Sequence, residues 1–143
     1  MKNFKTILIV TLIFDLLQSI PLVLPQFGSE MKDQMISDLN IEGLATSTAG
    51  QEVLDIMLYI FGFVFLGTIL SVLYTLRLKT KEGLKAATFI LFLVHLFWTL
   101  PDFVTLLSGG AAHPPIAIMA LTLIPVAGLL YVSQKGESRS SKN

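Results

Sequence analysis

The sequence contains no cysteine and carries little charge. The absence of cysteine excludes disulfides, thiolate metal ligands, cysteine nucleophiles and acylation of a cysteine. Ten basic residues balance ten acidic ones, so no positive excess points to nucleic acid as a partner. Two histidines are too few for a histidine-rich metal site, and no other signature of a bound metal or cofactor is present. We therefore expect a chain without metal, cofactor or nucleic acid.

What the chain does contain is long apolar runs. Hydrophobic residues make up 53% of its 143 residues and charged residues only 14%, whereas a soluble domain carries about a quarter charged residues. A membrane-spanning helix needs about 20 mostly apolar residues. Four segments meet this requirement, at residues 7–24, 53–76, 84–107 and 114–132. We predict an all-α fold, a four-helix transmembrane bundle that forms a single integral membrane domain over residues 1–143.

The basic residues are distributed unevenly about these spans. Nine of the ten flank one set of helix ends, and only Lys32 lies in the loop after the first span. The positive-inside rule then places both termini and the 77–83 turn in the cytoplasm, with the 25–52 loop and the 108–113 turn outside. An acidic residue within the first span, and no small-residue cleavage site after it, indicate a retained span rather than a signal peptide.

The outer loop at residues 25–52 carries apolar residues at helical spacing. This pattern predicts a short amphipathic helix that lies at the membrane interface or caps the bundle. Its apolar members are Met31, Met35, Ile36 and Leu39. The Gly-, Ser- and Thr-rich stretch at 43–50 predicts a flexible link into the second span. The polar residues 134–143 predict a disordered tail.

Ionisable side chains occur inside the apolar spans. Each costs at least about 2.5 kcal/mol there unless it is paired or lies in a wet cavity. Asp15 lies near the middle of the first span, with Gln18 one turn further on. In the third span His95, Thr99 and Asp102 fall on one helix face. We therefore expect a polar site within the bundle.

Three further residues border this site. Trp98 flanks the polar face of the third span, and Asp55 and His113 lie at the outer ends of the second and fourth spans. The candidate ligand-binding set is therefore Asp15, Gln18, Asp55, His95, Trp98, Thr99, Asp102 and His113.

These polar residues admit two interpretations. In the functional one they form an outward-opening polar track with Asp15 and His95 paired at its base. A carboxylate beside an imidazole titrates near physiological pH, which suits proton transfer or recognition of a cationic or hydroxylated ligand. In the structural one they form hydrogen bonds between helices and hold the bundle together.

The layout of the chain resembles the DoxX-like group of small bacterial membrane proteins. Shared features are four short spans, a longer first outer loop, the basic turn RLKTKEGLK at 77–85, and the ending PDFVTLLSGG of the third span. The resemblance covers the whole chain and implies a four-helix fold in the bacterial cytoplasmic membrane, without a particular activity. A second similarity, to sterol-isomerase-like proteins, implies an acidic pocket for hydrophobic amines and sterols, but the acidic residues are placed differently here.

We expect a small polytopic protein of the lipid bilayer that binds a small or lipidic ligand, acting alone, as a homo-oligomer or as an accessory subunit of a membrane partner. A proton-linked transporter that uses Asp15 and His95 is an alternative, as is a membrane-embedded enzyme. The sequence has no G-x-S-x-G, no H-E-x-x-H and no P-loop, which favours a non-enzymatic role. A purely structural or assembly role also stays open.

Overall fold

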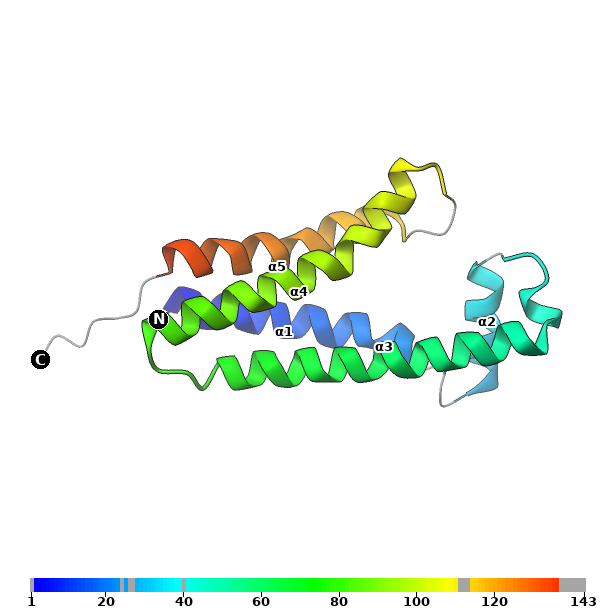
Figure 1. Cartoon of the computed structure of the whole chain (residues 1–143), viewed down its shortest axis with the longest axis horizontal. Coiled ribbons are helices and arrows are strands. Elements are labelled where there is room, and N and C mark those ends of the chain that lie inside the picture. The colour runs from blue at the N-terminus through cyan, green and yellow to red at the C-terminus, as the bar shows by residue number, and fades with distance from the viewer. Residues whose placement is uncertain (1, 24, 26–27, 40, 111–113, 137–143) are drawn as a thin grey trace, which may run out of the picture. The chain divides into compact units, whose positions relative to one another are not determined.

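The chain is mostly helical in the computed structural model, which describes residues 2–23, 25, 28–39, 41–110 and 114–136. No β-strand occurs among these residues, so the all-α prediction is confirmed. In chain order the elements are α1 (Lys2–Val23), α2 (Ser29–Leu39), the 3₁₀ turn η2 (Leu44–Thr46), α3 (Thr48–Thr75), α4 (Lys81–Leu107) and α5 (Ile116–Lys135) (Figure 1).

Four of these helices, α1, α3, α4 and α5, are long and apolar enough to cross a bilayer. The shortest, α5, has 20 residues and so extends about 30 Å, the thickness of the hydrocarbon layer. Large apolar side chains such as Phe63, Phe97 and Leu107 are exposed on their surfaces, as lipid-facing residues are. The four predicted spans are confirmed as helices, and the chain is a multi-pass membrane protein.

Three of the four long helices begin before the predicted apolar runs, whereas α5 begins at Ile116, two residues after the predicted start. The first begins at Lys2 rather than at residue 7, and α3 begins at Thr48 rather than at residue 53. Helical hydrogen bonding does not require apolar side chains, so it continues through polar residues at the membrane surface. The first turns of α1, α3 and α4 are therefore helical although hydrophobicity alone does not predict them.

The predicted disordered tail begins too early. Gln134 and Lys135 belong to α5, and Gly136 N–H donates to the Val132 carbonyl at 2.9 Å. Lys85 of α4 donates from Nζ to the Gln134 carbonyl at 2.9 Å. A cation at the carbonyl end of a helix satisfies that end and complements its dipole. The remainder of the predicted tail, 137–143, lies outside the described residues.

The predicted flexible link at 43–50 is an ordered turn in the structure. Gly43 has φ of 76°, a left-handed conformation that glycine adopts readily, and starts η2. The Gly50 N–H then donates to Ser47 Oγ at 3.0 Å, which caps the beginning of α3. The small and polar residues here form a turn and a helix cap. The same residue types are also typical of flexible links, so composition alone predicted flexibility.

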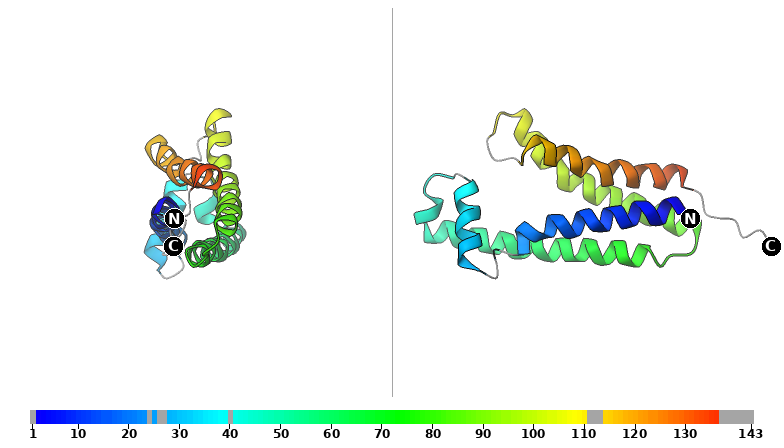
Figure 2. Two further views of the ribbon diagram at one scale, coloured as in Figure 1. Left: turned by 90° about the vertical axis from the view of Figure 1, so that its left-hand side faces the viewer. Right: turned by 180° about the vertical axis from the view of Figure 1, so that it is seen from behind.

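The helices group into two compact units. Unit 1 comprises Met1–Phe14 and Thr68–Asn143, and unit 2 comprises Asp15–Gly67. Within unit 1, α4 packs closely along α5 (Figures 1 and 2). The core of unit 1 is formed by Phe4, Leu8, Val72, Leu84, Leu91, Leu129 and Val132.

The beginning of α1 packs against α5 within unit 1, where two glycines permit close approach. A Cβ atom at Gly128 would lie 3.1 Å from both Cδ1 and Cγ2 of Ile7. A Cβ atom at Gly136 would overlap the ring of Phe4, which is fully buried. Small residues at such points let helix backbones approach each other, and this packing drives helix association in membranes. The start of α1, the α3–α4 turn and the end of α5 therefore lie at the same end of unit 1 (Figure 2).

Unit 2 contains the predicted amphipathic helix. The structure confirms it as α2, with Ile36 buried and Asp33 and Ser37 exposed. Met35 is half-buried and Met31 is exposed, so the apolar face is only partly covered within the protein. A helix of this kind is suited to the membrane interface.

Candidate functional site

A buried stripe runs along α4 and carries two of the candidate residues. Its members are spaced by three or four residues and are Leu84, Thr88, Leu91, His95 and Thr99. His95 is 8% exposed and Thr99 is 5% exposed, although both lie in a helix of high hydropathy. The predicted polar face of the third span thus points into the protein rather than towards lipid.

The hydrogen bonds of His95 and Thr99 define what these groups can offer. His95 Nδ1 lies 2.7 Å from the carbonyl oxygen of Leu91. A carbonyl can only accept, so Nδ1 carries the proton, and in the neutral ring Nε2 is then the acceptor. The Thr99 hydroxyl donates to the His95 carbonyl, and its oxygen retains only acceptor capacity. The Nδ1 proton of His95 and the hydroxyl proton of Thr99 are therefore both engaged within α4.

Further along α4, Trp98 and Asp102 are half-buried. Both are in the helix, at three and seven residues beyond His95, which is the same side of α4. Pro101 lies inside the helix and has no N–H to donate to the carbonyl of Phe97. The C-terminal part of α4 thus adds a carboxyl group and a backbone acceptor to the same helix.

In unit 2, Asp15 is the most deeply buried ionisable side chain, with 1% of its surface exposed. It lies eight residues after Ile7, where the apolar run of α1 begins, and so about 12 Å into that run. Gln18, one turn further on, is half-buried. A carboxyl group at this depth faces the protein interior and not the hydrocarbon.

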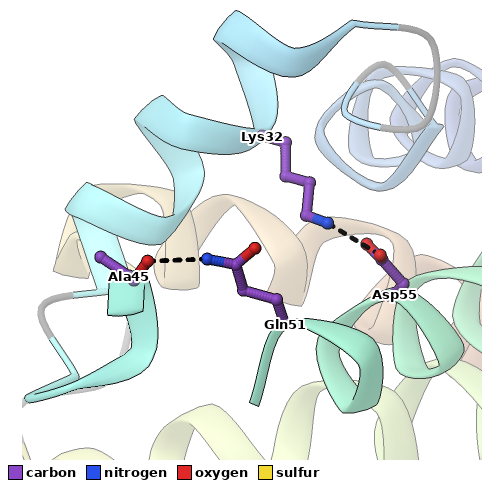
Figure 3. Close-up of polar contacts among 4 residues, drawn as sticks. All are labelled: Lys32, Ala45, Gln51 and Asp55. Carbon is purple, nitrogen blue, oxygen red and sulfur yellow. Dashed lines mark hydrogen bonds and ion pairs between the residues drawn. The ribbon is translucent and has the colours of Figure 1, made fainter. Parts of the chain in front are cut away.

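The carboxylate of Asp55 forms an ion pair and is not isolated. Its Oδ2 lies 2.7 Å from Nζ of Lys32, which joins α2 to α3 within unit 2 (Figure 3). Nearby, the Gln51 side chain donates from Nε2 to the Ala45 carbonyl at 2.8 Å. Both members of the ion pair are partly exposed, so the pair is expected to contribute only about 0.2–1 kcal/mol.

The structure thus distributes the eight candidate residues over different places. His95, Trp98, Thr99 and Asp102 share α4 in unit 1, whereas Asp15, Gln18 and Asp55 lie in unit 2. His113 lies outside the described residues. Because Asp15 and His95 belong to different units, their pairing stays a prediction.

Sequence reasoning missed a set of buried hydroxyl groups. Each donates to a carbonyl three or four residues earlier on its own helix, and the set comprises Thr75, Thr88, Thr122 and Ser133. Thr11 is different, because its buried Oγ1 has no hydrogen-bond partner within the described part of the chain. The only sequence signal for them is a hydroxyl residue inside an apolar helix. Lys32 was missed as the partner of Asp55 because the two residues are 23 positions apart and lie on different helices.

Among the described residues no group of three His, Cys, Asp or Glu side chains lies close enough to hold a metal ion. No known protein family, curated protein or solved structure matches this chain.

Proposed function

We propose that this multi-pass membrane protein binds a small or lipidic ligand through polar groups within its helices. The observation that carries the proposal is the burial of Asp15, a carboxyl group that is 1% exposed in the middle of a membrane-spanning helix. Ionisable groups at this depth are costly and usually serve a site or a polar pathway. Ligand pockets are usually lined by apolar side chains with a few polar groups among them, and a carboxyl group enclosed by apolar helices has this character.

The chemistry of the buried groups favours a ligand that donates hydrogen bonds. The oxygens of the Asp15 carboxyl group are hydrogen-bond acceptors, and in unit 1 the Nδ1 proton of His95 is donated to the Leu91 carbonyl. The Thr99 hydroxyl already donates its hydrogen bond to the His95 carbonyl. An ammonium or hydroxyl group complements such acceptors, and an anionic group does not. The preferred ligand is therefore an apolar amine or alcohol.

Proton-linked transport is the alternative that uses the same two ionisable residues. A transporter needs a polar route to both sides of the membrane. The buried hydroxyls nearest the basic end of unit 1, including Thr75, Thr88 and Ser133, donate their protons to their own helices. Such groups are satisfied as structural hydrogen bonds. This arrangement favours binding over transport.

We also propose that the chain is a DoxX-like protein of the bacterial cytoplasmic membrane with both termini inside. Four apolar helices, a helix in the longer outer loop and a basic α3–α4 turn support the proposal. In unit 1, the basic residues Lys5, Arg77 and Lys135 belong to segments that lie at one end, as the positive-inside rule requires of a cytoplasmic face.

The test compares three probes of equal chain length with the purified full chain in detergent: dodecylamine, dodecanol and dodecanoate. Dodecylamine and dodecanol should raise the melting temperature, and dodecanoate should not. At a probe concentration one hundred times Kd, binding stabilises a protein by about 2.7 kcal/mol. Asp15→Asn should abolish the response to the amine.

The matched control is Asp33→Asn, which changes an exposed carboxylate on α2. It should leave the response to dodecylamine unchanged. Equal stabilisation by all three probes, or an unchanged amine response in the Asp15 variant, would refute the proposed site. Proton flux in vesicles that depends on Asp15 and His95 would instead support transport.

A further inference from the structure

A groove separate from the candidate site lies in unit 1, between the last turns of α3 and the first half of α4. It has a volume of about 330 Å³ and is open on one side. Its walls include Leu70, Tyr74, Ala87, Ile90 and Leu91. Leu70, Tyr74 and Ile90 are among the exposed apolar residues of this membrane protein. A groove of this kind faces the lipid, and its apolar walls can accommodate a hydrocarbon chain.

Basic residues gather where the two walls of the groove are joined. The connection between α3 and α4 carries Arg77 and Lys79, both exposed, and Lys81 opens α4. Lys85 is already engaged with the Gln134 carbonyl of α5. Glu82 is the one acidic residue between Arg77 and Lys85, so residues 77–85 keep a net positive charge.

The start of α4 adds to this positive field. Its N-cap is Thr80, whose Oγ1 accepts from the Gly83 N–H at 3.3 Å. The N-terminal end of a helix carries a partial positive charge that favours anions. Tyr74, 67% exposed in the last turn of α3, lies where an aromatic ring is favoured, between hydrocarbon and headgroups.

We propose that this groove is a specific site for one anionic phospholipid. The phosphate is held by Arg77, Lys79 and Lys81, and an acyl chain lies in the groove against Leu70 and Ile90. Charge complementarity selects an anionic headgroup, as basic clusters beside membrane helices do. The apolar groove, whose lining reaches Thr75 two residues before Arg77, selects a lipid rather than a free phosphate. Basic residues that served only to orient the chain would require neither the groove nor a particular lipid.

The test titrates the purified full chain in detergent with dioleoyl phosphatidylglycerol or dioleoyl phosphatidylcholine and counts bound lipids by native mass spectrometry. Phosphatidylglycerol should saturate one site per chain, and phosphatidylcholine should bind far more weakly. Glycerol 3-phosphate at millimolar concentration should not displace the bound lipid. Equal binding of the two lipids, or displacement by glycerol 3-phosphate, would overturn the proposal.

Two variants separate the roles of charge and groove. Each cation near a membrane surface contributes about fivefold to the affinity for anionic lipid, so Arg77→Gln, Lys79→Gln and Lys81→Gln together should weaken binding roughly a hundredfold. Lys135→Gln, which removes an exposed cation at the end of α5, is the matched control and should have little effect. Ala87→Phe keeps every charge but fills the groove, and it should also weaken binding at least tenfold. A triple variant no worse than the control, or full binding by Ala87→Phe, would overturn the proposal.

Discussion

Replacing Gly128 by leucine tests how α1 and α5 are held together in unit 1. A Cβ atom at this position would lie 3.1 Å from two carbons of Ile7. At Gly67 of α3 a Cβ atom would meet no atom of the described chain within 4 Å. Gly67→Leu is therefore a matched control, because both changes add the same side chain to the interior of an apolar helix.

The expected difference follows from these distances. Carbon atoms pack at about 3.5–4.0 Å, so the first added carbon at Gly128 already overlaps Ile7 by roughly half an ångström. Overpacking of this kind costs about 1–3 kcal/mol. Leucine has a better helix propensity than glycine by about 0.8 kcal/mol, and this gain applies equally at both positions. The free energy of unfolding of Gly128→Leu should thus be about 1–3 kcal/mol below that of Gly67→Leu.

The assay is unfolding of the full chain in mixed micelles by a denaturing detergent, followed by circular dichroism. Ile7→Ala introduced into Gly128→Leu should recover part of the lost stability, because it removes the overlapping atoms. Equal stability of the two leucine variants would contradict the close approach. So would a double variant that recovers nothing.

Three other predictions concern individual groups. Lys32→Gln should lower the global free energy of unfolding by less than about 1 kcal/mol, because the ion pair with Asp55 is partly exposed. It should nevertheless accelerate amide hydrogen exchange in α2. Unchanged exchange would show that the ion pair does not hold α2 in place. Thr11→Val should raise the free energy of unfolding by about 1 kcal/mol, because no described residue bonds the buried hydroxyl, and a decrease in the same denaturation assay would disprove this. In intact cells Ser37→Cys should react with an impermeant maleimide and Lys135→Cys should not; the reverse pattern would invert the proposed orientation.

The spans could be predicted from sequence because the requirement for them is local. About 20 apolar residues in succession are sufficient to indicate a membrane helix, and the spacing of Met31, Met35 and Ile36 was sufficient for α2. The ends were less predictable. Gln134 is helical although it is polar, and a lysine 49 residues away in the chain bonds its carbonyl. No local pattern contains such a contact.

The candidate site was predictable in the same limited sense. The depth of Asp15 and the shared face of His95 and Thr99 follow from counting residues along a helix, and the structure buries all three. The partner of Asp55 is 23 residues away on another helix, and nothing in the sequence around it indicates a pair. Likewise Gly128 resembles any other glycine in an apolar helix until Ile7 is placed against it.

The central claim is that Asp15 recognises a ligand within the membrane. The most direct measurement is native mass spectrometry of the full chain extracted from its membrane, comparing wild type with Asp15→Asn and with the exposed control Asp33→Asn. Wild type and the control should retain the same apolar molecule bearing an amine or hydroxyl group, and Asp15→Asn should lose it while remaining folded. An empty wild-type protein, or the same molecule retained by a folded Asp15→Asn variant, would contradict the claim.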